Sequence, residues 1–276
     1  MRSETLEGRS GQPDGRSRLG DIFSRLRAEK RHGLVTYITA GDPDLPRTEG
    51  ILRALDRAGA DVIEVGVPFS DPLADGPVIQ RATERALAAG ATLAGVLATV
   101  AKVRADLRAG VVIFSYANPI LRFGAERVAD AARDAGVDGV LVLDLPIEES
   151  ADFRDLLGSR GIDTILLLSP TTSDERLRTA VTLGSGFLYA ISRLGVTGVR
   201  DQLADGAEEM VARIRAVSDL PLALGFGISK PEHVRAVGQW ADAAVVGSGL
   251  VNVIAEAGAS NDLNTRVEEY VRWLKS

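Results

Sequence analysis

The sequence predicts an α/β protein built as a (β/α)8 barrel, also called a TIM barrel, with an extra helix near each end of the chain. Eight short apolar segments alternate with longer segments of helical periodicity, and the 276 residues fit the typical barrel length of about 250. No charge run or low-complexity linker divides the middle of the chain, which favours one catalytic domain over residues 19–276. An open, doubly wound parallel sheet is the competing architecture.

The expected strands are short and almost wholly apolar, as is typical of parallel strands whose two faces are both covered by other elements. They are expected at residues 34–39, 62–66, 111–115, 139–143, 164–168, 187–191, 221–225 and 243–247.

The segments between these strands have apolar residues at helical spacing. They predict helices at residues 48–58, 78–88, 93–107, 125–135, 151–158, 174–183, 207–217 and 231–239, with two further helices at 250–257 and 261–274. Before the first strand, an amphipathic helix is expected over 19–29. Residues 1–18 contain a single leucine among polar and charged residues, which predicts a disordered tail. Its three acidic residues argue against a transit peptide.

Composition excludes several classes of protein. The net charge of −6 and the pI near 5.2 argue against nucleic acid or an anionic membrane as the main partner. The absence of cysteine excludes disulfides, thiolate nucleophiles and cysteine-based metal sites. No apolar run reaches the roughly 18 residues of a membrane span, and the N-terminus lacks the apolar core of a secretory signal. We expect a soluble, cytoplasmic protein.

The second expected strand carries an acid where a core residue is normal. Glu64 shares a strand face with Val62 and Gly66, and a buried carboxylate is costly unless something requires it. The loop that follows, residues 67–76, exceeds the usual length of about 2–6 and ends with a second acid, Asp75. We expect the two carboxylates to act as an acid–base pair. The alternatives are an ion pair between Glu64 and an arginine, and a helix-capping role for Asp75.

Three other acids that follow strands, Asp42, Asp44 and Asp144, lie beside or near prolines and are expected to form turns, as is Asp71 in the long loop.

Small residues end the last two strands, where barrel enzymes often bind phosphate. Strand 7 leads into Gly227, and strand 8 into Gly247 and Ser248. Backbone N–H groups and helix N-termini at such loops favour a dianion, whereas the alternative is that these glycines only open tight turns. Tyr189, on strand 6, could pack in the core or contact a ligand. The glycine-containing loop after strand 6 is a candidate lid.

Elimination narrows the chemistry. The four lysines, Lys30, Lys102, Lys230 and Lys275, all lie outside the expected strands, whereas a Schiff-base aldolase needs an amine aimed into the barrel. The only two histidines, His32 and His233, are far apart in the sequence and cannot supply the clustered ligands of a metal-dependent aldolase. Carboxylate acid–base catalysis on a phosphorylated small molecule remains.

These segments resemble the alpha subunit of tryptophan synthase, from about Ile22 to Leu274. The matching motifs are TAGDP (39–43), EVGVPFSDPLADGP (64–77), DLP (144–146), YAISR (189–193), GVTG (195–198), GFGIS (225–229) and GS (247–248). The second motif is long enough to be very specific. The resemblance implies reversible cleavage of indole-3-glycerol phosphate to indole and glyceraldehyde 3-phosphate, without a metal or a Schiff base.

By position, the resemblance implies that Glu64 and Asp75 are catalytic. Glu64 would protonate the indole ring carbon C3 and help to deprotonate the glycerol hydroxyl, and Asp75 would take the indole N–H proton or stabilise its developing positive charge. It further implies a substrate-contacting Tyr189, a lid residue Thr197, and apolar walls at Phe226 and Leu141. The implied phosphate-binding residues are Gly198, Gly227, Gly247 and Ser248.

The resemblance also implies that this chain needs no cofactor of its own. Its partner would be a beta subunit that carries pyridoxal phosphate, in an α2β2 assembly, with contacts from the loop after strand 2 and from residues 116–119. Two alternatives stay open: another phosphate-binding barrel enzyme, such as a sugar-phosphate isomerase, and a silent barrel that only activates a beta-type partner.

Overall fold

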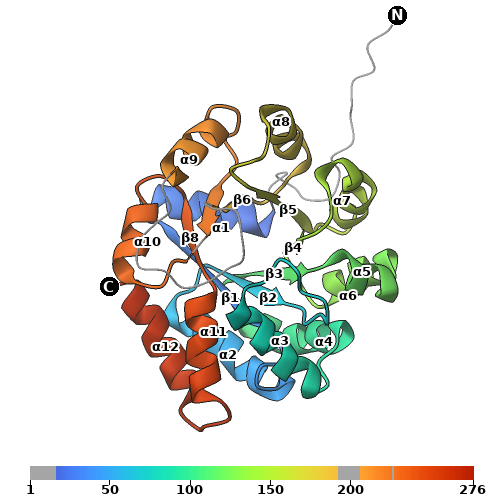
Figure 1. Ribbon diagram of the computed structural model, residues 1–276, viewed down its shortest axis with the longest axis vertical. Coiled ribbons are helices and arrows are strands. Elements are labelled where there is room, and N and C mark those ends of the chain that lie inside the picture. Colours follow the sequence, from blue (N-terminus) through green and yellow to red (C-terminus); the bar gives the residue numbers. More distant parts are fainter. Residues whose placement is uncertain (1–16, 192–205, 226) are drawn as a thin grey trace, which may run out of the picture.

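The computed structural model describes residues 17–191, 206–225 and 227–276. Eight parallel strands in these ranges close into a barrel in chain order (Figure 1). They are β1 (Gly33–Thr39), β2 (Val62–Gly66), β3 (Gly110–Ser115), β4 (Gly139–Val142), β5 (Asp163–Leu168), β6 (Leu188–Ile191), β7 (Leu222–Gly225) and β8 (Ala243–Val246). The predicted barrel is confirmed, with each strand end within one residue. An open doubly wound sheet is wrong because β1 pairs with β8.

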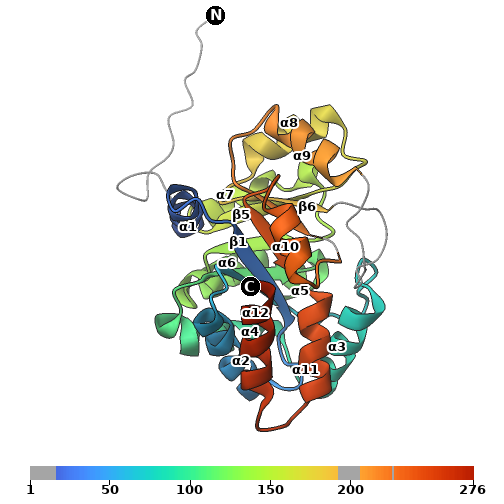
Figure 2. The same cartoon turned by 90° about the vertical axis from the view of Figure 1, so that its left-hand side faces the viewer.

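Helices surround the barrel in both views (Figures 1 and 2). In the described residues they are α1 (Arg18–Ala28), α2 (Leu45–Ala58), α3 (Pro77–Ala88), α4 (Leu93–Val103), α5 (Ala117–Phe123), α6 (Ala125–Asp134), α7 (Ala151–Gly158), α8 (Asp174–Leu183), α9 (Ala207–Arg215), α10 (Pro231–Val237), α11 (Ser248–Ala257) and α12 (Leu263–Leu274). Two short 3-10 helices, η1 (Arg104–Asp106) and η2 (Ile147–Glu149), complete the set.

Several helix predictions need correction. The helix α5 was not expected, and the segment predicted as one helix over 93–107 divides at Val103 into α4 and η1. The helix α2 begins three residues early because Asp44, expected only to form a turn, is its N-cap and accepts the backbone N–H of Arg47 at 2.7 Å. The helix α11 begins two residues early, at Ser248, and α12 begins two residues late, at Leu263. The helices α9 and α10 each end two residues early.

Two hydrophobic layers hold the barrel. Side chains that alternate along the strands point inward, as in the cluster that contains Val62, Val112 and Leu141. The intervening residues, such as Ile63 and Val65, pack outward against the helices. This alternation confirms that β2 has an apolar outer face and an inner face that carries Glu64.

The helix α1 covers the barrel end where the strands begin. Four apolar residues of α1 belong to the inner cluster, as the amphipathic pattern predicted: Leu19, Ile22, Phe23 and Leu26.

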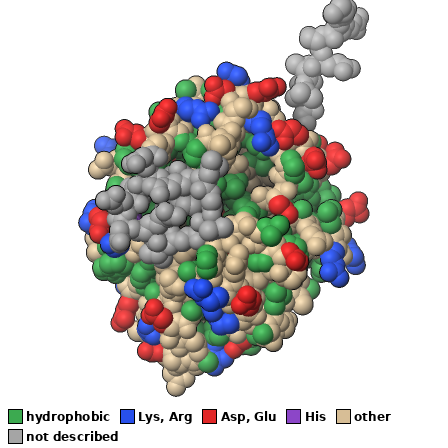
Figure 3. Space-filling model, viewed as in Figure 1, with side chains coloured by type: hydrophobic (Ala, Val, Ile, Leu, Met, Phe, Trp, Pro, Cys, Tyr) green, Lys and Arg blue, Asp and Glu red, His purple; other side chains and the backbone are tan. Residues whose placement is uncertain are grey.

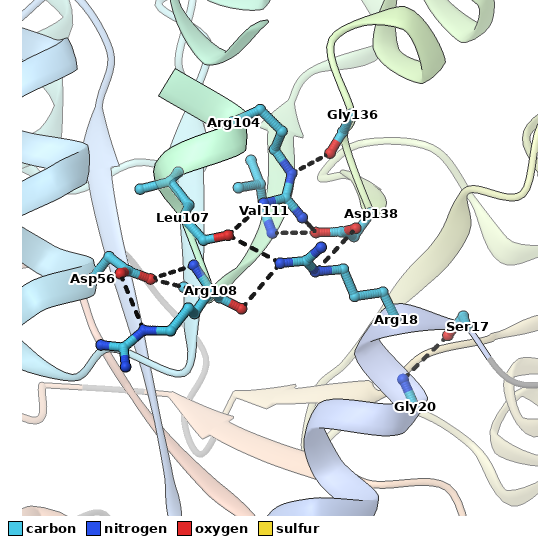
Figure 4. Close-up of polar contacts among 11 residues, drawn as sticks. Ser17, Arg18, Gly20, Asp56, Arg104, Leu107, Arg108, Val111, Gly136 and Asp138 are labelled. Carbon is cyan, nitrogen blue, oxygen red and sulfur yellow. Dashed lines mark hydrogen bonds and ion pairs between the residues drawn. The ribbon is translucent and has the colours of Figure 1, made fainter. Parts of the chain in front are cut away.

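Ser17 caps this helix by accepting the N–H of Gly20. Arg18 donates to the carbonyl of Leu107 at 3.0 Å and faces Asp138, which also pairs with Arg104 (Figure 4). Because α1 covers this end, we expect the active site at the opposite end of the barrel, where the strands finish. The rest of the predicted tail, residues 1–16, lies outside the described residues.

Candidate active site

Glu64 lies at the centre of β2, in register with Tyr37 of β1 and Val112 of β3. Its side chain has no solvent exposure, and neither carboxyl oxygen has a hydrogen-bond partner among the described residues. Burial raises its pKa to about 8. An ion pair with a described arginine is therefore ruled out, and Glu64 carries its proton at neutral pH.

Asp75 lies in the loop between β2 and α3 and is 6% exposed. Burial raises its pKa to about 6, against the opposing effect of a hydrogen bond from Tyr116. Its backbone fixes the loop: the N–H bonds to Pro72 at 3.0 Å, and the carbonyl accepts the Gln80 side chain at 2.8 Å. The N-cap of α3 is Gly76, so the capping alternative for Asp75 is wrong. Asp75 is mostly ionised at neutral pH.

Tyr116, at the end of β3, holds the loop that carries Asp75. Its hydroxyl accepts the N–H of Ala74 at 3.1 Å and hydrogen-bonds the Asp75 carboxylate. Its ring packs on Phe69, near the start of the same loop, with centroids 5.2 Å apart. One side chain thus fixes both ends of the loop, a role that the sequence did not reveal.

Replacing Tyr116 by phenylalanine is expected to raise the pKa of Asp75, because the lost hydrogen bond favoured the ionised carboxylate. A bond worth about 1 kcal/mol corresponds to roughly 0.7 pKa units. The acid limb of the kcat/KM–pH profile should move up by that amount, while kcat/KM well above this limb stays within about threefold of wild type. A profile that keeps its acid limb in place would contradict this role.

Two tyrosines lie at the mouth of the barrel, each against a glycine of a neighbouring strand. The Tyr189 hydroxyl lies 2.5 Å from where a Cβ on Gly225 would stand, and the Tyr37 hydroxyl 2.3 Å from that of Gly66. Any side chain at either glycine would collide with a phenol. Tyr189 shares its strand face with Phe187 and packs against the inner cluster, so it is a packing residue that also carries a hydroxyl.

Three of the four residues predicted to bind phosphate, Gly227, Gly247 and Ser248, follow the ends of β7 and β8. Gly227 has a φ of +66°, which a side chain rarely adopts. Gly247 is the N-cap of α11 and Ser248 its first residue, and no described side chain caps the helix. The N–H groups of the first turn and the helix dipole favour an anion here. The Cβ of Ser229 lies 3.5 Å from where a Cβ on Gly249 would stand. The Ser229 hydroxyl is buried and has no hydrogen-bond partner among the described residues.

The remaining predicted site residues are Leu141, Thr197, Gly198 and Phe226. Leu141 is fully buried within the inner cluster. Half-buried Phe114, which is in register with both Gly66 and Leu141, is a second, more exposed apolar residue on the same face, and sequence reasoning missed it. Thr197, Gly198 and Phe226 lie outside the described residues, as does the candidate lid. In the space-filling view, hydrophobic side chains gather around a hollow near the middle of this face (Figure 3).

The remaining acids near the mouth serve structure. Buried Asp42 forms a two-point ion pair with Arg85 of α3, at 2.8 and 2.7 Å, and so ties the loop after β1 to the helix that follows Asp75. Asp144 accepts the N–H of Ala117 at the start of α5. Asp71 is exposed, and its carboxylate accepts a hydrogen bond from the hydroxyl of its neighbour Ser70 at 2.6 Å. No group of three or more potential metal-ligating side chains occurs in the described ranges.

The tryptophan synthase alpha chain family model matches residues 23–276. The chain belongs to the tryptophan synthase alpha chain family. It is 45% identical to the alpha chain of Solibacter usitatus, over 94% of this chain and 97% of that one. Among solved structures, the alpha subunit of Legionella pneumophila has a TM-score of 0.84 at 38% identity, with 94% and 97% of the two chains covered. A tryptophan synthase α2β2 complex from Pyrococcus furiosus has a TM-score of 0.82 at 38% identity, with 88% and 97% covered.

Membership of the alpha chain family makes this protein a lyase of tryptophan synthesis, and no comparison favours the isomerase or silent-barrel alternatives. In the described part of the chain, no single helix is long and apolar enough to cross a membrane. Among these residues, α3 together with α4 and η1 has the length and apolar composition of a span, but the two parts are bent by 91° relative to each other.

Proposed function

We propose that this chain cleaves indole-3-glycerol phosphate to indole and glyceraldehyde 3-phosphate. The observation that carries the proposal is the contrast between the two acids. Glu64 is buried without a partner and keeps its proton to about pH 8, whereas Asp75, at the same mouth, ionises near pH 6. Two carboxyl groups with separated pKa values supply an acid and a base at neutral pH.

The reaction needs an acid that protonates the indole ring and a base that accepts a proton from it. Glu64 gives its proton to indole C3 while ionised Asp75 accepts the indole N–H proton, which leaves a neutral indolenine. Glu64, now a carboxylate, takes the proton of the adjacent glycerol hydroxyl. The C–C bond then breaks as the aldehyde forms, its electrons pass to C3 and through the C=N bond to nitrogen, and Asp75 returns its proton. Both acids end as they began.

The other predicted site residues complete this proposal. The N-terminus of α11, with Gly247 and Ser248, would hold the phosphate together with Gly227 and Gly198. Tyr189 would contact the glycerol chain, Leu141 and Phe226 the indole, and Thr197 would act from the lid. We propose that the chain uses no cofactor of its own, works in the cytoplasm, and pairs with a beta subunit that carries pyridoxal phosphate.

Two exposed leucines near the mouth support the proposed partner. Leu73, in the loop after β2, is 89% exposed, and Leu121, on α5, is 70% exposed. Tyr116 connects these two segments because it bonds the loop and directly precedes α5. An apolar side chain so close to full exposure favours an interface. The Pyrococcus furiosus relative is an α2β2 complex, and we propose the same assembly here.

Replacing Leu73 by aspartate is expected to weaken beta-subunit binding by about tenfold or more, since a charge would be desolvated at the interface. Basal indole release should stay within about twofold. Titration calorimetry with the beta subunit checks the binding. Replacing Trp273 by alanine is the matched control, because it removes another exposed apolar side chain, from α12. Equal binding by the Leu73 variant and wild type would place the interface elsewhere.

The assay that tests the function is indole release from indole-3-glycerol phosphate, with and without a beta subunit. Indole formed by the isolated chain supports the proposal, and faster release with the partner supports the assembly. Partner activation without any indole release would identify a silent barrel. Turnover of a phosphorylated sugar, with no indole formed, would identify an isomerase.

A further inference from the structure

Tyr37 crosses the mouth of the barrel between the phosphate-binding residues and the two acids. The base of its side chain lies against Gly247 at the end of β8, where an added Cβ would be 3.5 Å from the Tyr37 Cβ. Its hydroxyl lies over Gly66 at the end of β2, two residues after Glu64. The side chain therefore extends from the end of β8, beside Ser248, to the end of β2, beside the strand that carries Glu64.

The surrounding elements fix the ring in this position. Tyr37 belongs to a cluster with Ile79 of α3 and Val251 of α11, the two helices that begin beside Asp75 and at Ser248. The Phe114 ring meets it edge-on, with centroids 5.3 Å apart and planes at 77°. A ring held on three sides presents its hydroxyl at a defined point, which is what recognition of a single substrate atom needs.

The Tyr37 hydroxyl has unused hydrogen-bonding capacity. Among the described residues, its hydrogen-bond contact is with the Thr39 hydroxyl at 3.5 Å, well beyond the usual O–H···O distance of about 2.7–2.8 Å. Buried tyrosine hydroxyls normally find a partner. Burial and the nearby charge of Asp75 raise its pKa well above the ordinary value, so it is a donor at every pH at which the enzyme works.

We propose that Tyr37 is a specificity-determining residue whose hydroxyl binds the glycerol hydroxyl that takes no part in the reaction. This inference rests on the proposed function. The substrate chain between indole and phosphate carries two hydroxyls: Glu64 acts on the one beside the indole ring, and the other lies one carbon closer to the phosphate. Tyr37, placed between the acids and Gly247, is positioned for that second hydroxyl.

The test uses the reverse reaction, in which indole condenses with an aldehyde phosphate, and compares wild type with Tyr37→Phe. One aldehyde is glyceraldehyde 3-phosphate, and the other is 3-oxopropyl phosphate, which lacks only the hydroxyl in question. We expect wild type to prefer glyceraldehyde 3-phosphate, because a site that hydrogen-bonds a hydroxyl rejects the analogue without it. In Tyr37→Phe the ratio of the two kcat/KM values should fall about tenfold. The kcat/KM for glyceraldehyde 3-phosphate should fall, while that for 3-oxopropyl phosphate should stay the same.

The outcomes separate this inference from the proposed function. If Tyr37→Phe slows both aldehydes equally, or neither, the hydroxyl contact is refuted while condensation by wild type still supports the function. If wild type condenses neither aldehyde with indole, both fail. Phenylalanine keeps the packing against Ile79, Val251 and Phe114, so thermal unfolding close to that of wild type confirms that only the hydroxyl has been removed.

Discussion

Glu64→Gln is expected to lower kcat for indole release by about 10³-fold, within the range of about 10²–10⁴ that general acid–base catalysis contributes. Glutamine keeps the shape of the side chain but can neither give a proton to indole C3 nor take one from the glycerol hydroxyl. Both proton transfers belong to the chemical steps, so kcat and kcat/KM should fall together while KM changes little. Steady-state indole release measures both constants.

A stability measurement provides the control for this variant. The Glu64 carboxyl ionises near its ordinary pKa of 4.5 when unfolded but only near pH 8 when folded. The folded chain thus holds one more proton in this window, and wild type loses stability as the pH rises through it. The stability of Glu64→Gln relative to wild type should therefore increase by about 1.4 kcal/mol per pH unit between about pH 5 and about pH 8.

Urea unfolding at several pH values in that window checks this difference. If the variant is folded, and relatively more stable at high pH, but inactive, its loss of activity comes from the missing proton transfers and not from unfolding. Wild-type turnover by the variant would refute the role of Glu64. A pH-independent stability difference would instead refute its burial as a neutral acid.

The barrel could be predicted because its strands are buried on both faces. A strand such as β2 must then be a short apolar run, and a single acid within it stands out against that background. The same reasoning failed for α5, because this helix has seven residues and exposes Leu121, so no amphipathic pattern marks it. The start of α2 did carry a signal, since Asp44 precedes a proline in the first turn, but this signal was interpreted as a turn.

The sequence allowed only part of the proposed site to be predicted. Glu64 and Asp75 could be proposed because a carboxyl group is unusual at their positions. Tyr37 could not, since an aromatic residue in an apolar strand is typical of a core. Its proposed role comes from two glycine neighbours. Gly66 lies beside it because β1 pairs with β2, whereas Gly247 lies beside it because the barrel closes between β1 and β8. This second neighbour depends on closure, which no local pattern encodes.

Asp75→Asn is expected to lower kcat/KM by about 10²-fold and to change the shape of its pH profile. In wild type, activity should rise through about pH 6 as Asp75 ionises and becomes able to accept the indole N–H proton. It should fall through about pH 8 as Glu64 loses the proton that it must give to C3. The variant should lack the rise near pH 6 and keep the fall near pH 8.

This profile assigns each limb to one acid, because kcat/KM reports the groups of the free enzyme. Tyr116→Phe moves the acid limb, Asp75→Asn removes it, and neither should move the alkaline limb, which belongs to a carboxyl buried apart from both side chains. An acid limb that persists near pH 6 in Asp75→Asn would show that another group titrates there. The pairing of a neutral Glu64 with an ionised Asp75, on which the proposed reaction depends, would then be wrong.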